Sequence, residues 1–158
     1  MLQLKTILQP TDFTANAEHA FQLACSLARD HSCRLIVLHV VPPPETVIGE
    51  FGMPPLELED QQMVQRQFDR LRSEAPLAIE CVEMQGAPAK QIVEFARQQN
   101  CDLIVMSADE HSGLGRLILA GVTEEVAGNA PCTVLIVKTP VGTRAAATDA
   151  DARQTVAP

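Results

Sequence analysis

Short apolar runs alternate along this chain with segments of helical spacing, and that alternation limits the possible folds more than any other feature. Continuous apolar residues occupy positions 35–38, 103–106 and 134–137, and a weaker run ends at Ile7 and Leu8. Runs without polar alternation are typical of strands buried on both faces of a sheet. Residues 77–84 mix apolar and polar side chains, which predicts a more exposed edge strand.

Between these runs, apolar residues recur every three or four positions, as they do on the buried face of a helix. The repeats cover residues 17–28, 64–71, 89–96 and 119–126. Thr14 or Asn16 is placed to cap the first helix, and Pro131 separates the last helix from the final strand. Strict alternation predicts the α/β class: an open, five-stranded parallel sheet with helices on both faces. Such sheets bind ligands beyond the carboxyl ends of the strands, where the strand order reverses.

The chain of 158 residues has the length of one domain, which we assign to residues 1–140. Residues 41–55 are rich in proline and predict a semi-rigid excursion before the second helix. Residues 141–158 are small and polar without apolar periodicity, so we expect a disordered C-terminal tail. No apolar run approaches the roughly 18 residues that cross a bilayer, so we expect no membrane insertion.

Charge and aromatic content argue against a nucleic-acid partner. The formal net charge is −8, which opposes a phosphate backbone, and the chain has no Trp or Tyr on which bases could stack. The first ten residues lack the apolar stretch of a secretory signal, so we expect a cytoplasmic location. The five cysteines form no C-x-x-C pair and lie in apolar stretches, as reduced core thiols do; they are Cys25, Cys33, Cys81, Cys101 and Cys132.

Common catalytic and metal-binding signatures are absent from the sequence. It contains no G-x-x-x-x-G-K-[ST] phosphate loop, no G-x-S-x-G nucleophile elbow and no H-E-x-x-H zinc motif. The four histidines lie far apart. His39 directly follows an apolar run, so we predict a hydrogen-bonded residue at a strand end rather than a metal ligand. We therefore expect no catalytic residue, no metal and no required cofactor.

Asp12 follows the first predicted strand and has two interpretations. It can be a turn or N-cap carboxylate before the first helix, or an acceptor for a sugar hydroxyl or base amine of a ligand, and both can hold at once. The loop at residues 107–116 faces Asp12 if the first and fourth strands are neighbours. Its Ser112, Gly113 and Arg116 leave open whether this loop also binds an anion.

Three segments of the chain resemble the universal stress protein family. Residues 7–14 (ILQPTDFT) are similar to its first strand and Asp-containing turn, and residues 38–41 (LHVV) to the end of its second strand. Residues 102–138 resemble its C-terminal signature, and the whole similarity covers residues 2–139. The resemblance implies the strand order 3-2-1-4-5. It also implies a homodimer in which the strand from Thr133 to Val137 pairs antiparallel with its copy, and an apolar edge strand needs such a cover.

Nucleotide-binding members of that family carry G-x-x-G-x9-G-[ST] after the fourth strand, where glycine amides and the final hydroxyl hold the phosphates. The corresponding positions here all depart from this pattern; they are Ser107, Glu110, Ala120 and Gly121. The positions that contact the nucleoside in binding members are matched better; they are Pro10, Thr11, Asp12, Val40 and Met106. The candidate ligands are therefore ATP and AMP.

These departures predict a weak phosphate site. A Glu110 carboxylate ~4 Å from a phosphate charge opposes binding by about 1 kcal/mol in water and about 4 kcal/mol near a protein surface. If the first glycine position requires a positive φ, Ser107 adds roughly 1–2 kcal/mol, and the missing hydroxyl at Gly121 removes a bond worth about 1 kcal/mol. Together these terms weaken a micromolar site by ~100-fold or more.

The resemblance and its departures lead to three hypotheses about function. We expect a cytoplasmic, dimeric stress-response or regulatory module that binds ATP weakly or not at all and acts on an unknown protein partner. The alternative is an adenine-nucleotide sensor with a remodelled phosphate loop, which prefers adenosine or AMP to ATP. A slow nucleotide hydrolase ranks third, because no general base, metal site or activated nucleophile supports it.

Overall fold

Strands and helices alternate as the sequence predicts. The computed structural model describes residues 3–43, 61–108 and 121–138. The elements are β1 (Thr6–Pro10), α1 (Ala15–Asp30), β2 (Arg34–Val41), α2 (Gln61–Glu74), β3 (Glu80–Gln85), α3 (Pro88–Gln98), β4 (Leu103–Ser107), α4 (Val122–Asn129) and β5 (Thr133–Val137). The strands form one parallel sheet in the order β3-β2-β1-β4-β5, which confirms the α/β class and the strand order implied by the resemblance.

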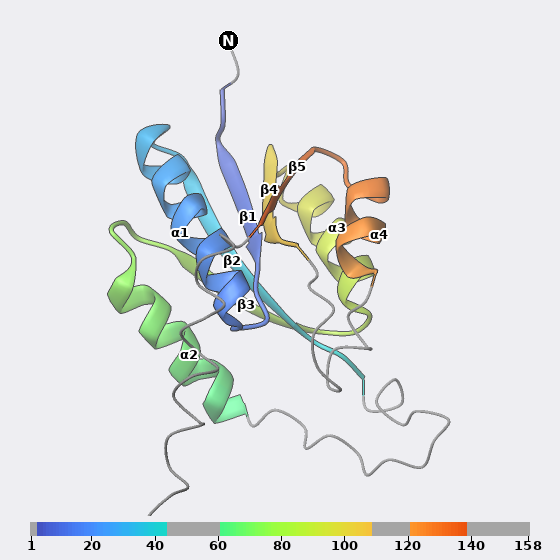
Figure 1. Ribbon diagram of the computed structural model, residues 1–158, viewed down its shortest axis with the longest axis horizontal. Coiled ribbons are helices and arrows are strands. Elements are labelled where there is room, and N and C mark those ends of the chain that lie inside the picture. The colour runs from blue at the N-terminus through green and yellow to red at the C-terminus, as the bar shows by residue number, and fades with distance from the viewer. Residues whose placement is uncertain (1–2, 44–60, 109–120, 139–158) are drawn as a thin grey trace, which may run out of the picture.

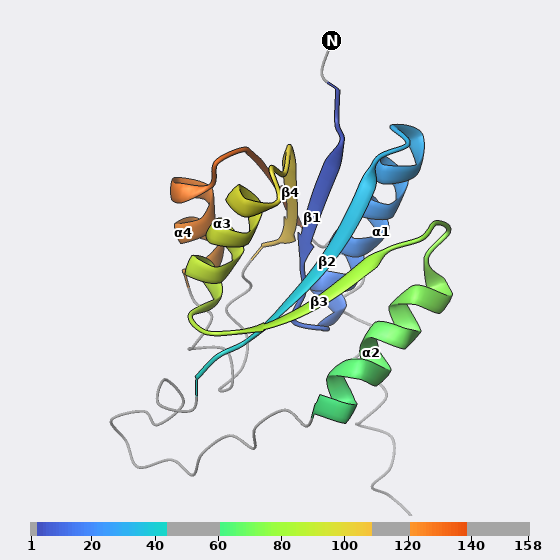
Figure 2. The same ribbon diagram turned by 180° about the vertical axis from the view of Figure 1, so that it is seen from behind.

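The helices cover the sheet in two layers. α1 and α2 lie on one face, and α3 and α4 lie on the other, as the two opposite views show (Figure 1 and Figure 2). Ile7 packs with Phe21 and Phe68 beneath α1 and α2, whereas Leu8 packs with Ile104 beneath α3 and α4. Successive residues of a strand face opposite ways, so the central strands contribute apolar side chains to both layers.

Local signals set the helix starts. Thr14 caps α1, because its hydroxyl accepts a hydrogen bond from the Ala17 amide at 3.3 Å. Of the two caps that the sequence offered, Thr14 is the one used, and Asn16 lies inside the helix. Pro88 occupies the first turn of α3, where a missing N–H removes no helical hydrogen bond.

The two edge strands differ from the strands between them. β3 begins at Glu80, later than the predicted residue 77, although Leu77 and Ile79 already pack against the core beneath α1 and α2. In β5, Leu135 is 36% exposed and Ile136 is 41% exposed. The continuous apolar run of β5 predicts burial on both faces, but a single chain does not provide it, because β4 is the one described strand that pairs with β5.

Polar side chains join the strands at their amino ends. Asp102, directly before β4, accepts hydrogen bonds from the backbone N–H groups of Lys5 at 2.8 Å and Thr6 at 2.9 Å. The hydrogen bond from Lys5, and after it the one from Thr6, holds the pKa of the Asp102 carboxyl below its ordinary value. Beside them the Arg34 guanidinium donates to Glu80 Oε2 at 2.6 Å, which joins β2 to β3.

Two predicted segments fall largely or wholly outside the description. The proline-rich excursion lies mostly in residues 44–60, and the tail at residues 141–158 lies entirely beyond the described part. Within that part, no helix combines the length and the apolar character of a membrane span.

Candidate functional site

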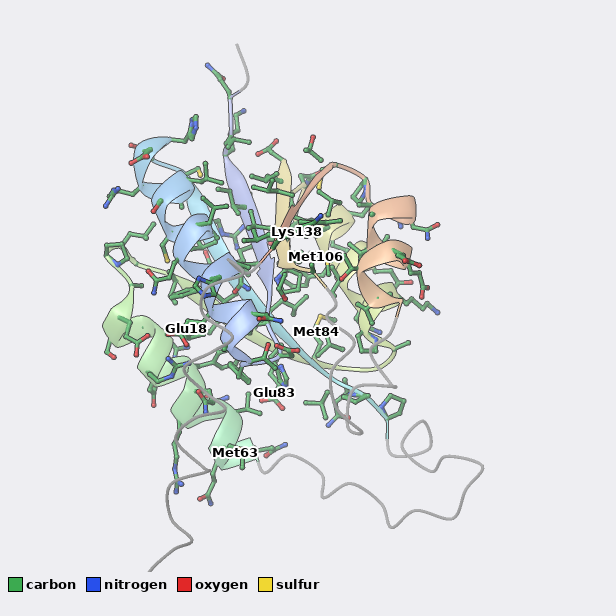
Figure 3. The ribbon with its side chains drawn as sticks, in the orientation of Figure 1. Glu18, Met63, Glu83, Met84, Met106 and Lys138 are labelled. Atoms are coloured by element: carbon green, nitrogen blue, oxygen red, sulfur yellow. The ribbon has the colours of Figure 1, made fainter. Side chains whose placement is uncertain are left out.

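The carboxyl edge of the sheet brings together three apolar positions that the resemblance assigns to a nucleoside. β2, β1 and β4 are adjacent, so Val40, Pro10 and Met106 lie at or near the ends of three neighbouring strands. Val40 and Met106 belong to the core beneath α3 and α4 and are 9% and 5% exposed. Pro10 lies two residues beyond Leu8, which packs in the same core. Met106 is labelled at the end of β4 in Figure 3.

β1 and β4 stop pairing before they reach this edge. Their paired positions end at Leu8 and Ile104, whereas β1 stays paired with β2 as far as Pro10. The strand order also reverses here, because β2 and β3 lie on one side of β1 while β4 and β5 lie on the other. Open α/β sheets bind ligands at such a switch point.

The turn after β1 is fixed by hydrogen bonds of its own side chains. Thr11 N–H donates to Leu38 O at 2.8 Å, and the Thr11 hydroxyl accepts from Phe13 N–H at 3.1 Å. Asp12 Oδ1 accepts from the N–H and the hydroxyl of Thr14, at 3.0 and 2.6 Å. Asp12 is therefore the turn carboxylate of the first interpretation. It is also exposed, so its second interpretation, as a ligand acceptor, stays a prediction.

His39 supports this turn from the side of α1 and α2. Its Nδ1 lies 2.8 Å from Thr11 O, and because a carbonyl oxygen only accepts, the ring nitrogen donates. The Phe13 ring lies against the imidazole with 4.6 Å between centroids, and Phe13 has a φ of 59°, which bulky residues rarely adopt. His39 is 4% exposed, and the predicted hydrogen-bonded residue at a strand end is confirmed.

The predicted phosphate loop is only partly described. Ser107 ends β4, and its φ is not positive, so the condition under which Ser107 would add backbone strain is not met. The Ser107 carbonyl accepts a hydrogen bond from the Thr123 hydroxyl at 3.3 Å, which ties β4 to the first turn of α4. Outside the described residues lie Glu110, Ser112, Gly113, Arg116 and Ala120.

The amino end of α4 offers little to a phosphate. Gly121 is the N-cap, has a φ of 96° and makes no side-chain hydrogen bond to the helix. Glu124 and Glu125 lie in the first turn and are exposed. Carboxylates at this end stabilise the helix dipole, but they repel an incoming phosphate. Lys138, exposed directly after β5, places one positive charge at the same edge (Figure 3).

Sequence reasoning missed Gln9, which is fully buried in β1 at 0% exposure. Its amide Nε2 donates to Pro10 O at 2.7 Å, and its Oε1 has no hydrogen-bond partner among the described residues. A polar residue within an apolar strand was the one signal that could have revealed it. The Pro10 and Thr11 carbonyls are thus both held by buried side chains, those of Gln9 and His39.

Side chains suited to metals or covalent chemistry are not gathered in the described residues. No three His, Cys, Asp or Glu residues of that part are arranged to hold a metal ion. All five cysteines are free, and burial raises the pKa of Cys25 and Cys101 to about 11, which suppresses the reactive thiolate.

The strand order, which reverses at β1, and the helices on both faces define a doubly wound α/β protein. A model described as "Universal stress protein family" matches residues 3–138. Universal stress protein MJ0531 of Methanocaldococcus jannaschii is 32% identical over 145 residues, covering 86% of this chain and 83% of the relative. The chain therefore belongs to the universal stress protein family.

Two solved structures have the same fold. Hypothetical protein MJ0577 of Methanocaldococcus jannaschii is 26% identical with a TM-score of 0.69, over 88% of this chain and 99% of the other. A universal stress protein solved in complex with cAMP is 21% identical with a TM-score of 0.64, over 88% of this chain and 100% of the other.

Proposed function

We propose that the chain is a cytoplasmic, homodimeric stress-response module that acts on a protein partner, binds ATP weakly or not at all, and performs no catalysis. The observation that carries this proposal is the amino end of α4. There, Gly121 supplies no hydroxyl, while Glu124 and Glu125 supply two exposed carboxylates.

Magnitudes favour weak ATP binding. A helix N-terminus stabilises an anion by roughly 0.3–1 kcal/mol at an exposed position. A carboxylate ~4 Å from a phosphate charge opposes it by about 1 kcal/mol even in water. Two carboxylates near this end offset what the helix offers, and the net charge of −8 acts in the same direction on a triphosphate.

A thermal-shift titration with millimolar Mg-ATP tests the proposal, with equal magnesium and ionic strength in the control. A ligand at ~100 times its Kd adds about 2.7 kcal/mol of stability, and a domain of this size gains roughly 2–4 °C per kcal/mol. We expect a shift below about 1 °C. A shift of several degrees would refute weak ATP binding.

The homodimer proposal is supported by the exposure of β5. An edge strand presents unpaired backbone groups, and this one also exposes the apolar side chains of Leu135 and Ile136. Antiparallel pairing of β5 with the β5 of a second copy would extend the sheet and cover both side chains. The apolar run of residues 134–137 then becomes buried, as its pattern predicts.

Matched substitutions test this interface. Ile136→Glu places a charge in the proposed interface, whereas Leu23→Glu places one on α1, at a residue that is similarly exposed at 37%. Light scattering after size exclusion is expected to give a monomer for Ile136→Glu and a dimer for the unchanged chain and Leu23→Glu. A dimer that survives Ile136→Glu, or a monomeric unchanged chain, would contradict the interface.

A second candidate function is supported by the nucleoside half of the edge. Val40 and Met106 pack in one apolar core, and Pro10 ends the strand between theirs, two residues before the exposed Asp12 carboxylate; a base needs such apolar surface and a sugar such an acceptor. One family member has been solved in complex with cAMP, a nucleotide with a single phosphate. On this proposal the chain senses adenosine or AMP rather than ATP.

Calorimetric titrations of adenosine, AMP and Mg-ATP separate the two functions. The sensor predicts that adenosine and AMP bind and that ATP binds no more tightly than either. Absence of heat with all three ligands supports the module without a nucleotide. ATP binding at least tenfold tighter than adenosine would contradict both.

A further inference from the structure

Two buried polar side chains hold consecutive carbonyls behind the proposed nucleoside site. Gln9 Nε2 donates to Pro10 O at 2.7 Å, and His39 Nδ1 donates to Thr11 O at 2.8 Å. Gln9 lies two residues after Ile7, and His39 lies two residues after Val37, so both share the face covered by α1 and α2.

The Gln9 amide takes a position that a β4 backbone donor would otherwise fill. In a trans peptide the C=O and the following N–H point in opposite directions. Thr11 N–H donates to Leu38 O in β2, so Pro10 O points toward β4. The β1–β4 pairing has already ended at Leu8 and Ile104, and the Gln9 amide satisfies Pro10 O instead.

His39 sets the next peptide in the same way. Thr11 O points to the imidazole beneath α1 and α2, so Asp12 N–H points away from that layer. Val40 and Met106 lie on the opposite side of the sheet, beneath α3 and α4. The Asp12 N–H is thereby turned away from the His39 side, while the exposed carboxylate of the same residue accepts hydrogen bonds from Thr14 at the start of α1.

We propose that Gln9 and His39 are positioning residues, a carbonyl clamp that keeps β1 and β4 apart at the switch point and orients Asp12 toward a nucleoside. The nucleoside part rests on the second candidate function above. Neither side chain touches the ligand, because both lie on the α1 and α2 side of the sheet.

Packing alone does not account for Gln9. Its side chain is fully buried, its strand neighbour in β2 is Val37, and its Oε1 lacks a partner among the described residues. An unpaired buried acceptor destabilises a fold, and an apolar side chain would avoid that loss. The contribution of this residue is therefore the amide donor that reaches Pro10 O.

Substitutions that remove the donors without changing volume greatly test the clamp. We propose to make Gln9→Met and His39→Leu singly and together. If the double variant does not fold, the two single variants still test the clamp. His39→Asn is the rescue variant, because the Asn amide nitrogen lies where Nδ1 lay. Leu35→Val is the matched control, since it creates a small cavity in the same core at the amino end of β2, where Leu35 is 1% exposed.

Amide exchange by NMR reads the turn directly. The amides of Phe13 and Thr14 donate to side chains of the turn, and the amide of Ile36 in β2 reports global opening. In the clamp variants we expect exchange at Phe13 and Thr14 to rise at least tenfold relative to Ile36. The control and His39→Asn should stay within about threefold of the unchanged chain.

Adenosine affinity by calorimetry completes the test, with an expected loss of at least tenfold in the clamp variants and less than twofold in the control. Unchanged turn protection in every clamp variant would overturn the clamp. Lost protection with unchanged affinity would overturn its role in positioning. If the unchanged chain binds no adenosine, the second candidate function is wrong, and so is the proposal that the clamp orients Asp12 toward a nucleoside. The amide exchange measurement still tests whether Gln9 and His39 hold the turn.

Discussion

The amino and carboxyl edges of the sheet use their polar side chains in different ways. At the amino edge, Asp102 accepts from the backbone of Lys5 and Thr6 and so joins β4 to β1. At the carboxyl edge, the hydrogen bonds of Asp12 with described residues go to Thr14 in its own turn, and Gln9 caps the carbonyl of the residue that follows it. At the amino edge the Asp102 carboxylate joins two strands, whereas at the carboxyl edge the Asp12 carboxylate and the Gln9 amide bond within β1 and the turn that follows it.

Positive φ angles occur at both edges for different reasons. Ser32 and Asn100 have φ values of 52° and 49° and end α1 and α3, as left-handed residues after helices usually do. Phe13, at 59°, instead precedes α1 and lays its ring on His39. Left-handed backbone thus terminates helices at the amino edge, whereas at the carboxyl edge it shapes the turn of the proposed site.

The largest expected effect concerns thiol reactivity beside the amino edge. Burial raises the pKa of Cys101 from its ordinary value of 9.0 to about 11, which lowers its thiolate fraction ~100-fold at pH 8. We expect iodoacetamide to label Cys101 and Cys25 at least ~100-fold more slowly in the folded chain than in urea, by mass spectrometry. Native labelling at a rate close to that in urea would show that this edge opens locally and would weaken the contrast with the carboxyl edge.

The next effect is on stability at the amino edge. Asp102→Ala removes two charge-assisted hydrogen bonds and should lower the free energy of unfolding by about 2–3 kcal/mol, measured in urea at pH 7. Because the folded-state pKa of Asp102 is lowered, its contribution is full above its ordinary value of 3.8 and is lost as the pH falls through the folded-state value. A loss that persists unchanged in acid would contradict this mechanism.

Asp12→Ala is expected to separate the two edges in function. The substitution removes the turn bonds to Thr14 and should reduce stability by only about 0.5–1 kcal/mol, because Asp12 is exposed. Adenosine affinity should fall about tenfold, or about 1.4 kcal/mol. Asp12→Asn keeps the Oδ1 acceptor and serves as the control for the turn. Asp102→Ala should leave the adenosine affinity unchanged. An equal loss of adenosine affinity in both Ala variants would contradict a binding role confined to the carboxyl edge.

The smallest effect is expected at the exposed ion pair of the amino edge. Arg34 and Glu80 side chains are 42% and 51% exposed, so Arg34→Gln should lower stability by about 0.2–1 kcal/mol. The loss should shrink in 1 M salt, because the Debye length falls to about 3 Å. Urea titrations at low and high salt measure it, and a salt-independent loss would assign the effect to packing of the Arg34 stem instead.

The sequence predicts those features that depend on periodicity and local signals. The buried strands β1, β2 and β4 follow from continuous apolar runs, and the start of α1 follows from Thr14. The place of β5 at the sheet edge came from the family resemblance and not from its apolar run, because such a run does not tell whether its cover comes from the same chain. The contact from His39 to Thr11 depends on the register between β1 and β2, which no local pattern encodes.

The candidate site was predicted unevenly for the same reason. Pro10, Val40 and Met106 came from family resemblance, and the sheet order places them together. The Gln9 hydrogen bond to Pro10 O and the positive φ of Phe13 depend on residues that are close in space rather than on local sequence. A single sequence carries no signal that relates them.

Mapping of backbone amide shifts by NMR during an adenosine titration tests the contrast between the edges most directly. We predict perturbations at the carboxyl edge, in residues 11–13 and at Val40, Met106 and Gly121, with the amides of Lys5, Arg34 and Asp102 unmoved. Perturbations centred on the amino edge would contradict the account, and none at millimolar adenosine would exclude the second candidate function.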